Sequence, residues 1–248
     1  MIKRISVFLY GVVAYAIFVG VFVYALGFVG NFLVPKSIDS PPQIPLAQAL
    51  FVNFLVLGVF AIQHSVMARP AFKRWLTRFL PKPAERSNYV MMSNVAMIVL
   101  FVFWQPLGGT VWSVEDPLAR NALYAVMVGG WLLVFVSTLF INHFDLFGVR
   151  QVWLHLRDRE YTALTFRRPG FYRWVRHPLY VGWFIFFWAT PTMTVTHLLF
   201  AVVTTLYILV AVRLEERDLI AEHGQSYLDY RAEVPRLIPG TKLGTVAK

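Results

Sequence analysis

Two short segments in the C-terminal third of the chain carry the side chains best suited to bind a polar ligand. One is the run R-H-P-L-Y-V-G over residues 176–182, and the other begins with Glu215 and Glu216. The apolar stretch between them, residues 179–212, is interrupted by Pro191, and a proline inside a helix forces a kink. We therefore predict a hairpin that brings the two carboxylates close to the imidazole and guanidinium of the first segment. Such a site suits a ligand with an ammonium group, ribose hydroxyls and an aromatic base.

A second set of polar side chains lies in or next to apolar runs nearer the N-terminus. His64 and Asn94 are expected at similar depth in adjacent spans, and His143 and Asp145 close a later one. Polar groups at membrane depth are costly and commonly face a functional cavity. The alternative for His64 and Asn94 is a hydrogen bond between helices. For His143 the alternative is an interaction with the helix dipole.

The elements that position these residues are membrane helices. The 248-residue chain is 58% hydrophobic and 15% charged, whereas soluble domains are about 45–50% apolar and about 25% charged. A spanning helix needs about 20 mostly apolar residues. We predict an all-α integral membrane protein, a single domain over residues 1–248. Its five spans are residues 5–29, 46–67, 89–107, 119–141 and 179–212, the last a proline-broken hairpin.

The basic residues orient these spans. Of the 23 Lys and Arg, 21 fall on the side that holds the N-terminus, and the opposite side keeps Lys36 and Arg120. Because Lys and Arg favour the cytoplasmic side, we predict cytoplasmic termini in a bacterial inner membrane. Residues 142–178 and 213–240 would then form a cytoplasmic cap able to bind a soluble cofactor. We attribute the net charge of +10 to loops that lie beside anionic membrane lipid, because the basic residues sit between long apolar runs. We predict no nucleic-acid binding, which would need a water-facing basic domain.

Several kinds of site are excluded or not indicated. The chain has no cysteine, which removes disulfides, thiolate metal ligands and cysteine nucleophiles. No H-E-x-x-H motif, P-loop or G-x-G-x-x-G run occurs, so we predict no metal site and neither of those nucleotide sites. The sequence leaves the oligomeric state open.

The motifs of the C-terminal third resemble those of a known family. R-H-P-x-Y-x-G, E-E-x-x-L, G-x-x-Y-x-x-Y and V-P-R-x-I-P together cover residues 170–239. They resemble the membrane methyltransferases related to isoprenylcysteine carboxyl methyltransferase. The N-terminal half is similar to the branch of that superfamily that methylates methanethiol to dimethyl sulfide. The similar segments are residues 63–69, 85–90 and 142–152.

The resemblance implies S-adenosylmethionine as the methyl donor, bound on the cytoplasmic side, and a small thiol as the acceptor. His177, Tyr180 and Gly182 are then expected to shape the cofactor pocket, and Glu216 to contact the ribose or the ammonium group. The further candidates for cofactor binding are Gln151, Arg176, Pro178, Leu179, Glu215, Tyr227, Tyr230 and Arg236.

The implied reaction also calls for a base. Methyl transfer from a sulfonium is an in-line displacement in which positioning supplies much of the gain, but the thiolate is the reactive form of a thiol. Histidine is the natural proton acceptor near neutral pH. His64 and His143 are therefore both candidates, and the sequence does not choose between them. The groups expected to orient them are Asn88, Asn94 and Asp145.

Other functions stay open at this point. A related branch that methylates a prenylcysteine carboxylate or a phospholipid would share the C-terminal motifs. A membrane reductase that uses NADPH is a second class, with Arg167, Arg168 and Arg173 as candidates for the 2′-phosphate. A non-catalytic membrane factor of nitrogen-oxide metabolism, or a transporter, is a third.

Overall fold

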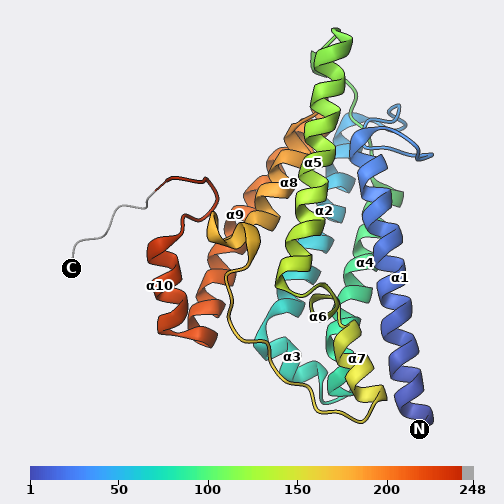
Figure 1. Ribbon diagram of the computed structural model, residues 1–248. Helices are drawn as coiled ribbons and strands as arrows, with labels where there is room; N and C mark the ends of the chain where they lie inside the picture. The colour runs from blue at the N-terminus through green and yellow to red at the C-terminus, as the bar shows by residue number, and fades with distance from the viewer. Residues whose placement is uncertain (242–248) are drawn as a thin grey trace. The chain divides into compact units, whose positions relative to one another are not determined.

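Figure 1 shows the protein as a computed structural model, in which residues 1–241 are described. Residues 242–248, the end of the chain, lie outside the described part. The chain divides into two compact units. The first contains residues 1–112, 142–163 and 193–197, and the second contains residues 113–141, 164–192 and 198–241.

Long apolar helices form the first unit. α1 (Ile2–Gly30) and α2 (Leu46–Ala68) both pack against α4 (Glu85–Phe103), and α1 and α4 lie side by side in Figure 1. Phe28, Leu100 and Trp104 are buried in its core. The shorter elements are α3 (Pro70–Leu76), the 3-10 turn η1 (Lys82–Ala84), α6 (His143–Leu146) and α7 (Val149–Leu156), and α7 packs on α1.

The second unit contains the rest of the helical chain. Its elements are α5 (Pro117–Ile141), the 3-10 turn η2 (Gly170–Arg173), α8 (Pro178–Trp188), α9 (Val195–His223) from its fourth residue onward, and α10 (Gln225–Glu233). α5 packs along α8. α8 and α9 run antiparallel, because Trp188 at the end of α8 donates to Thr205, whereas Tyr180 near its start donates to Glu215.

The predicted break in the last apolar stretch is confirmed. α8 ends at Trp188, and the short strand β2 (Thr192–Thr194) pairs with β1 (Thr110–Ser113) before α9 begins. The 11 residues of α8 make about 17 Å of helix, too short for a hydrocarbon core of about 30 Å. α9 continues to His223. Glu215 and Glu216 therefore lie inside a helix, whereas the sequence placed them in the segment after it.

Within residues 1–241, five helices are long and apolar enough to cross a membrane, and the all-α fold class is confirmed. The third of these helices, α4, begins at Glu85 and ends at Phe103, whereas the sequence predicted a span over residues 89–107. Gln105 precedes a proline, and a residue in that position avoids the helical conformation. The Asn53 side chain fixes this early end by bonding both the backbone N and O of Gln105, at 2.8 and 2.7 Å.

Two glycines allow α5 and α8 to approach closely. A Cβ added at Gly130 would lie 2.7 Å from the backbone N of Phe186, and one added at Gly182 would lie 2.8 Å from the backbone O of Gly130. Both distances are shorter than real Cβ contacts, so neither position has room for a side chain. Small residues commonly permit such close helix packing in membranes.

We expect Gly130→Ala to lower stability by about 1–3 kcal/mol, because the added methyl group overlaps backbone atoms of α8. Gly129→Ala is the matched control, since nothing lies within 4 Å of a Cβ at that position. Thermal unfolding in detergent should show a lower midpoint for the first variant. The control should keep or slightly raise the midpoint, as alanine favours a helix over glycine. Equal midpoints would contradict the close contact.

Candidate active site

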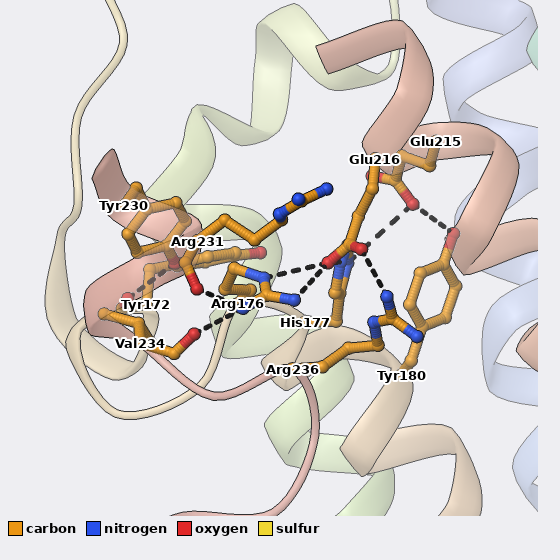
Figure 2. Close-up of polar contacts among 10 residues, drawn as sticks. All are labelled: Tyr172, Arg176, His177, Tyr180, Glu215, Glu216, Tyr230, Arg231, Val234 and Arg236. Carbon is orange, nitrogen blue, oxygen red and sulfur yellow. Dashed lines mark hydrogen bonds and ion pairs between the residues drawn. The ribbon is translucent and has the colours of Figure 1, made fainter. Parts of the chain in front are cut away.

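Glu216 is the centre of a buried charged cluster in the second unit (Figure 2). Its Oε1 accepts from Nε of Arg176 at 2.8 Å and lies 3.2 Å from Nε2 of His177. Its Oε2 accepts from Nη2 of Arg236 at 2.8 Å. The Glu216 side chain is 4% exposed and that of Arg176 is 0% exposed, so the pairing offsets the large cost of burying both charges. The predicted approach of the carboxylates to Arg176 and His177 is confirmed.

The segment after α10 packs against the start of α8 through its backbone. The N–H of Arg176 donates to the carbonyl of Pro235 at 2.9 Å, and that of His177 donates to the carbonyl of Arg236 at 3.2 Å. Nη1 of Arg176 also donates to the carbonyl of Val234. The V-P-R and R-H-P motifs, far apart in sequence, therefore form one local structure.

Tyrosines surround the same cluster. Tyr180 donates to Oε2 of Glu215 at 2.7 Å, and the Glu215 side chain is 43% exposed. Tyr230 donates to the carbonyl of Tyr172. The buried hydroxyl of Tyr227 has no hydrogen-bond partner among the described residues. Burial raises the pKa of Tyr227 and of Tyr230, so both phenols keep their protons at neutral pH.

The other residues predicted to bind the cofactor occupy several environments. Pro178 opens α8 and Leu179 follows it, half-buried. Gly182 lies against α5, where its small size serves helix packing. Gln151 belongs to the first unit, and its Nε2 donates to the carbonyl of Asp145 at 3.0 Å. Its Oε1 is buried and has no hydrogen-bond partner within residues 1–241. Contacts of these four with a cofactor stay predictions.

His143 lies in an aromatic box in the first unit. We define the box as Tyr15 and Phe18 of α1 together with Phe144 and Phe147, which follow His143 in the chain. The Tyr15 hydroxyl lies 2.7 Å from Nε2 of His143, and the four ring centroids lie 4.8–6.4 Å from that of the imidazole. His143 is 5% exposed. Burial lowers its pKa, so the imidazole is neutral at pH 7.

The residues flanking His143 fix its backbone. Asn142 has a φ of 137°, a value that costs energy for a residue other than glycine. Its side chain accepts from the backbone N of Asp145 at 3.1 Å and caps α6. The Asp145 carboxylate, predicted to orient the imidazole, accepts from Arg150 at 2.8 Å and from Tyr161 at 3.3 Å. Its charge is therefore balanced by a guanidinium.

His64 forms a second pair with a tyrosine. Its Nε2 lies 2.8 Å from the Tyr89 hydroxyl, and its Nδ1 lies 3.2 Å from the Ser93 hydroxyl. Phe18 and Phe147 pack against the core cluster that contains Tyr89. Two rings of the aromatic box therefore pack against the core cluster to which the tyrosine of this second pair belongs.

The two asparagines predicted to orient the base bind α1. Asn94, 3% exposed, donates to the carbonyl of Ala14 at 2.9 Å. Asn88 accepts from the Tyr10 hydroxyl at 2.9 Å. Asn94 thus makes the interhelical bond that was its alternative role. Both bonds hold α1, and with it Tyr15, in register with α4.

Comparison with known proteins shows the family. The model of the isoprenylcysteine carboxyl methyltransferase (ICMT) family matches residues 130–221. Methanethiol S-methyltransferase of Crocosphaera subtropica is 54% identical over 96% of this chain and 93% of its own. That of Mycobacterium tuberculosis is 50% identical over 96% and 97%. Methanethiol S-methyltransferase 2 of Bradyrhizobium diazoefficiens is 52% identical over 96% and 92%. The chain belongs to the methanethiol S-methyltransferase family.

Membership of this family makes the chain a methyltransferase and, together with its apolar helices, an integral membrane protein. The resemblance inferred from the sequence motifs is confirmed. The reductase, the transporter and the non-catalytic factor are thereby set aside. No solved structure matches the chain.

The groups around Glu216 fit S-adenosylmethionine, which carries an ammonium group, a carboxylate, ribose hydroxyls and a sulfonium. Glu215 offers a partly exposed carboxylate for a positive group. Nε of Arg236 and the hydroxyl of Tyr227 are buried without partners among the described residues. Unsatisfied buried polar atoms are rare in proteins and call for an explanation such as a missing ligand. Within residues 1–241, His, Asp and Glu form no group of three that could hold a metal ion.

The sequence did not predict a functional role for four aromatic residues near the histidines, namely Tyr15, Phe18, Tyr89 and Phe147. Phe, Trp and Tyr make up 17% of the chain, so residue type alone does not single them out. Tyr15 and His143 are 128 residues apart, and that separation leaves no local pattern. One signal was available, because a tyrosine inside an apolar span needs a partner for its hydroxyl.

Proposed function

We propose that the protein transfers the methyl group of S-adenosylmethionine to methanethiol and releases dimethyl sulfide and S-adenosylhomocysteine. The observation that carries this proposal is the 50–54% identity to methanethiol S-methyltransferases over 96% of the chain. That coverage includes most residues before 130, where the ICMT family model does not match. A branch that acts on prenylcysteine or a phospholipid would share mainly the C-terminal motifs.

The proposed donor site is the cluster around Glu216. When bound, S-adenosylmethionine supplies a methyl group on a positively charged sulfur. Glu215 would bind the ammonium group, Nε of Arg236 the carboxylate, and the Tyr227 hydroxyl a ribose oxygen. Glu216 was expected to bind the ribose or ammonium group itself. We assign it a positioning role, because Arg176, His177 and Arg236 already occupy its oxygens.

The proposed base is His143. It is buried and neutral, so it can take the proton of a thiol and generate the reactive thiolate. His64 is the second candidate, since it makes a similar pair with a tyrosine. Asn88, Asn94 and Asp145 are proposed to position the helices and the turn that carry the two histidines.

Cytoplasmic termini in a bacterial inner membrane belong to the same proposal, because the donor is a cytoplasmic metabolite. The basic residues support this orientation, since the predicted spans leave only Lys36 and Arg120 on the opposite side. Fluorescent-protein fusions at the C-terminus should be bright, and alkaline phosphatase fused within residues 105–118 should be active. An active phosphatase at the C-terminus would reverse the orientation.

The proposed activity can be tested with purified protein and methyl-deuterated S-adenosylmethionine. Headspace mass spectrometry should detect dimethyl sulfide carrying one deuterated methyl group only when protein, donor and methanethiol are all present. A prenylcysteine analogue and a phospholipid, supplied separately, should gain no label. Label in either of them without labelled dimethyl sulfide would move the protein to another branch of the superfamily.

A further inference from the structure

We infer that the acceptor thiol binds in the aromatic box around His143 and gives up its proton through the hydroxyl of Tyr15. The inference rests on the proposed function, which supplies the thiol and the methyl donor. It adds the place where the thiol binds and the atom that it touches first.

Accessibility indicates that Tyr15, rather than the imidazole, meets the substrate. His143 is 5% exposed, whereas Phe144 on one wall of the box is 54% exposed. Tyr15 lies between these extremes, half-buried. A substrate that enters past Phe144 therefore reaches the phenol, and the phenol is already 2.7 Å from Nε2 of His143.

The box has the chemistry of a site for a small apolar thiol. Its walls are aromatic rings, and divalent sulfur makes favourable contacts with ring edges. Phe18 and Phe147 stack at 3.9 Å and close one side, which limits the size of the acceptor. The His64 pair is less suited, because Tyr89 is only 9% exposed and the hydroxyl of Ser93 lies 3.2 Å from the imidazole.

The proposed step conserves every atom and charge. The thiol S–H bond breaks and its proton passes to the Tyr15 oxygen, while the Tyr15 proton moves to Nε2 of His143. The thiol sulfur forms a bond to the methyl carbon, and the bond from that carbon to the sulfonium sulfur breaks with its electron pair left on the donor. The imidazolium then returns its proton to water.

Tyr15→Phe tests the transfer of the proton. It should lower turnover of methanethiol on the order of 100-fold, at the low end of general-base effects, and leave donor binding unchanged. Its rate should rise about tenfold per pH unit toward the pKa of the thiol, because only free thiolate reacts. The double variant Tyr15→Phe with His143→Ala should be no slower than the slower single variant, since both residues act as one unit. If the loss of turnover in the double variant equalled the product of the losses in the two single variants, the inference would be overturned.

Two variants of the box walls test the location. Phe147→Leu and Phe144→Ala should each raise the preference for 1-propanethiol over methanethiol by on the order of 10-fold or more, the effect of one accommodated methylene. Phe101→Leu is the matched control, because Phe101 is a buried phenylalanine of the first unit that packs on Tyr24 and Phe28 outside the box. An unchanged preference in both box variants, or an equal shift in the control, would overturn the inference.

A binding measurement separates this inference from the proposed function. The fluorine NMR line of trifluoroethanethiol should broaden with wild-type protein in the absence of any methyl donor. The broadening should weaken in Phe18→Ala and persist in Phe101→Leu. Broadening without dimethyl sulfide formation would reject the proposed function alone, and dimethyl sulfide formation with broadening unaffected by Phe18→Ala would reject the box alone.

Discussion

Replacing Glu216 by Ala is expected to weaken donor binding strongly and to destabilise the second unit. The substitution leaves the guanidinium of Arg176, 0% exposed, without its carboxylate. Removing one partner of a buried ion pair costs about 3–5 kcal/mol. The substitution also removes the partner that positions Arg236. A loss of about 3 kcal/mol in donor binding corresponds to a fall in affinity of about 100-fold. Calorimetry with S-adenosylmethionine and thermal unfolding in detergent measure the two effects.

Two neighbouring carboxylates serve as controls for this result. Glu215→Gln should weaken donor binding roughly 10-fold or more through a lost charged hydrogen bond and leave the unfolding midpoint unchanged, because Glu215 is 43% exposed. Glu233→Ala should change neither property, since the exposed pair of Glu233 and Arg168 is worth about 1 kcal/mol or less. Unaltered donor binding in Glu216→Ala would reject the site.

His143→Ala is expected to give the largest loss of turnover among single substitutions in the first unit. Removing a general base typically costs about 10²–10⁴-fold, whereas donor binding belongs to the other unit and should be unchanged. His64→Ala should lose less, because its imidazole lies beside a buried phenol. Equal losses in the two variants would remove the preference for His143.

The pH profile gives an independent check on His143. Burial lowers its pKa, so the imidazole is neutral above about pH 6.5, the ordinary histidine pKa. Wild-type turnover should therefore be flat from that pH upward and fall only below it, as His143 gains a proton. The His143→Ala variant should instead speed up with rising pH, toward the thiol pKa of about 8.5 or above. If wild-type turnover instead rose with pH as steeply as that of His143→Ala, His143 would not act as the base.

Most of the donor site could be predicted from the sequence, because its parts are local motifs joined by a recognisable hairpin. Pro191 marked the break, and the break places Glu216 beside Arg176 and His177. The contacts of Gly182 could not be predicted. A glycine that makes room for a ligand and a glycine that lets another helix pack closely look the same in the sequence. The structure shows it against the backbone of Gly130.

Less of the acceptor site could be predicted from the sequence, because its contacts join segments that are far apart in the chain. His143 could be nominated by residue type, but its partner Tyr15 lies 128 residues away in a different helix. Asn94 and Asn88 were chosen as polar groups at depth, and only packing reveals that both bind α1. Sequence pattern identifies a polar residue that needs a partner, and tertiary structure is required to say which partner it has.

The long separation between Tyr15 and His143 also has a consequence for how the protein is made. α1 leaves the ribosome first, and at about 5–20 residues per second the intervening 128 residues take about 6–26 s to synthesise. For that time the Tyr15 hydroxyl has no His143 to pair with, whereas the Tyr10 hydroxyl lacks Asn88 of α4 only while the 78 residues between them are made. Residues 142–163 belong to the first unit, and they follow α5, which belongs to the second. A substitution that slows membrane insertion of α5 therefore prolongs the exposure of an unfinished first unit to quality-control proteases, although α5 contributes no residue to that unit.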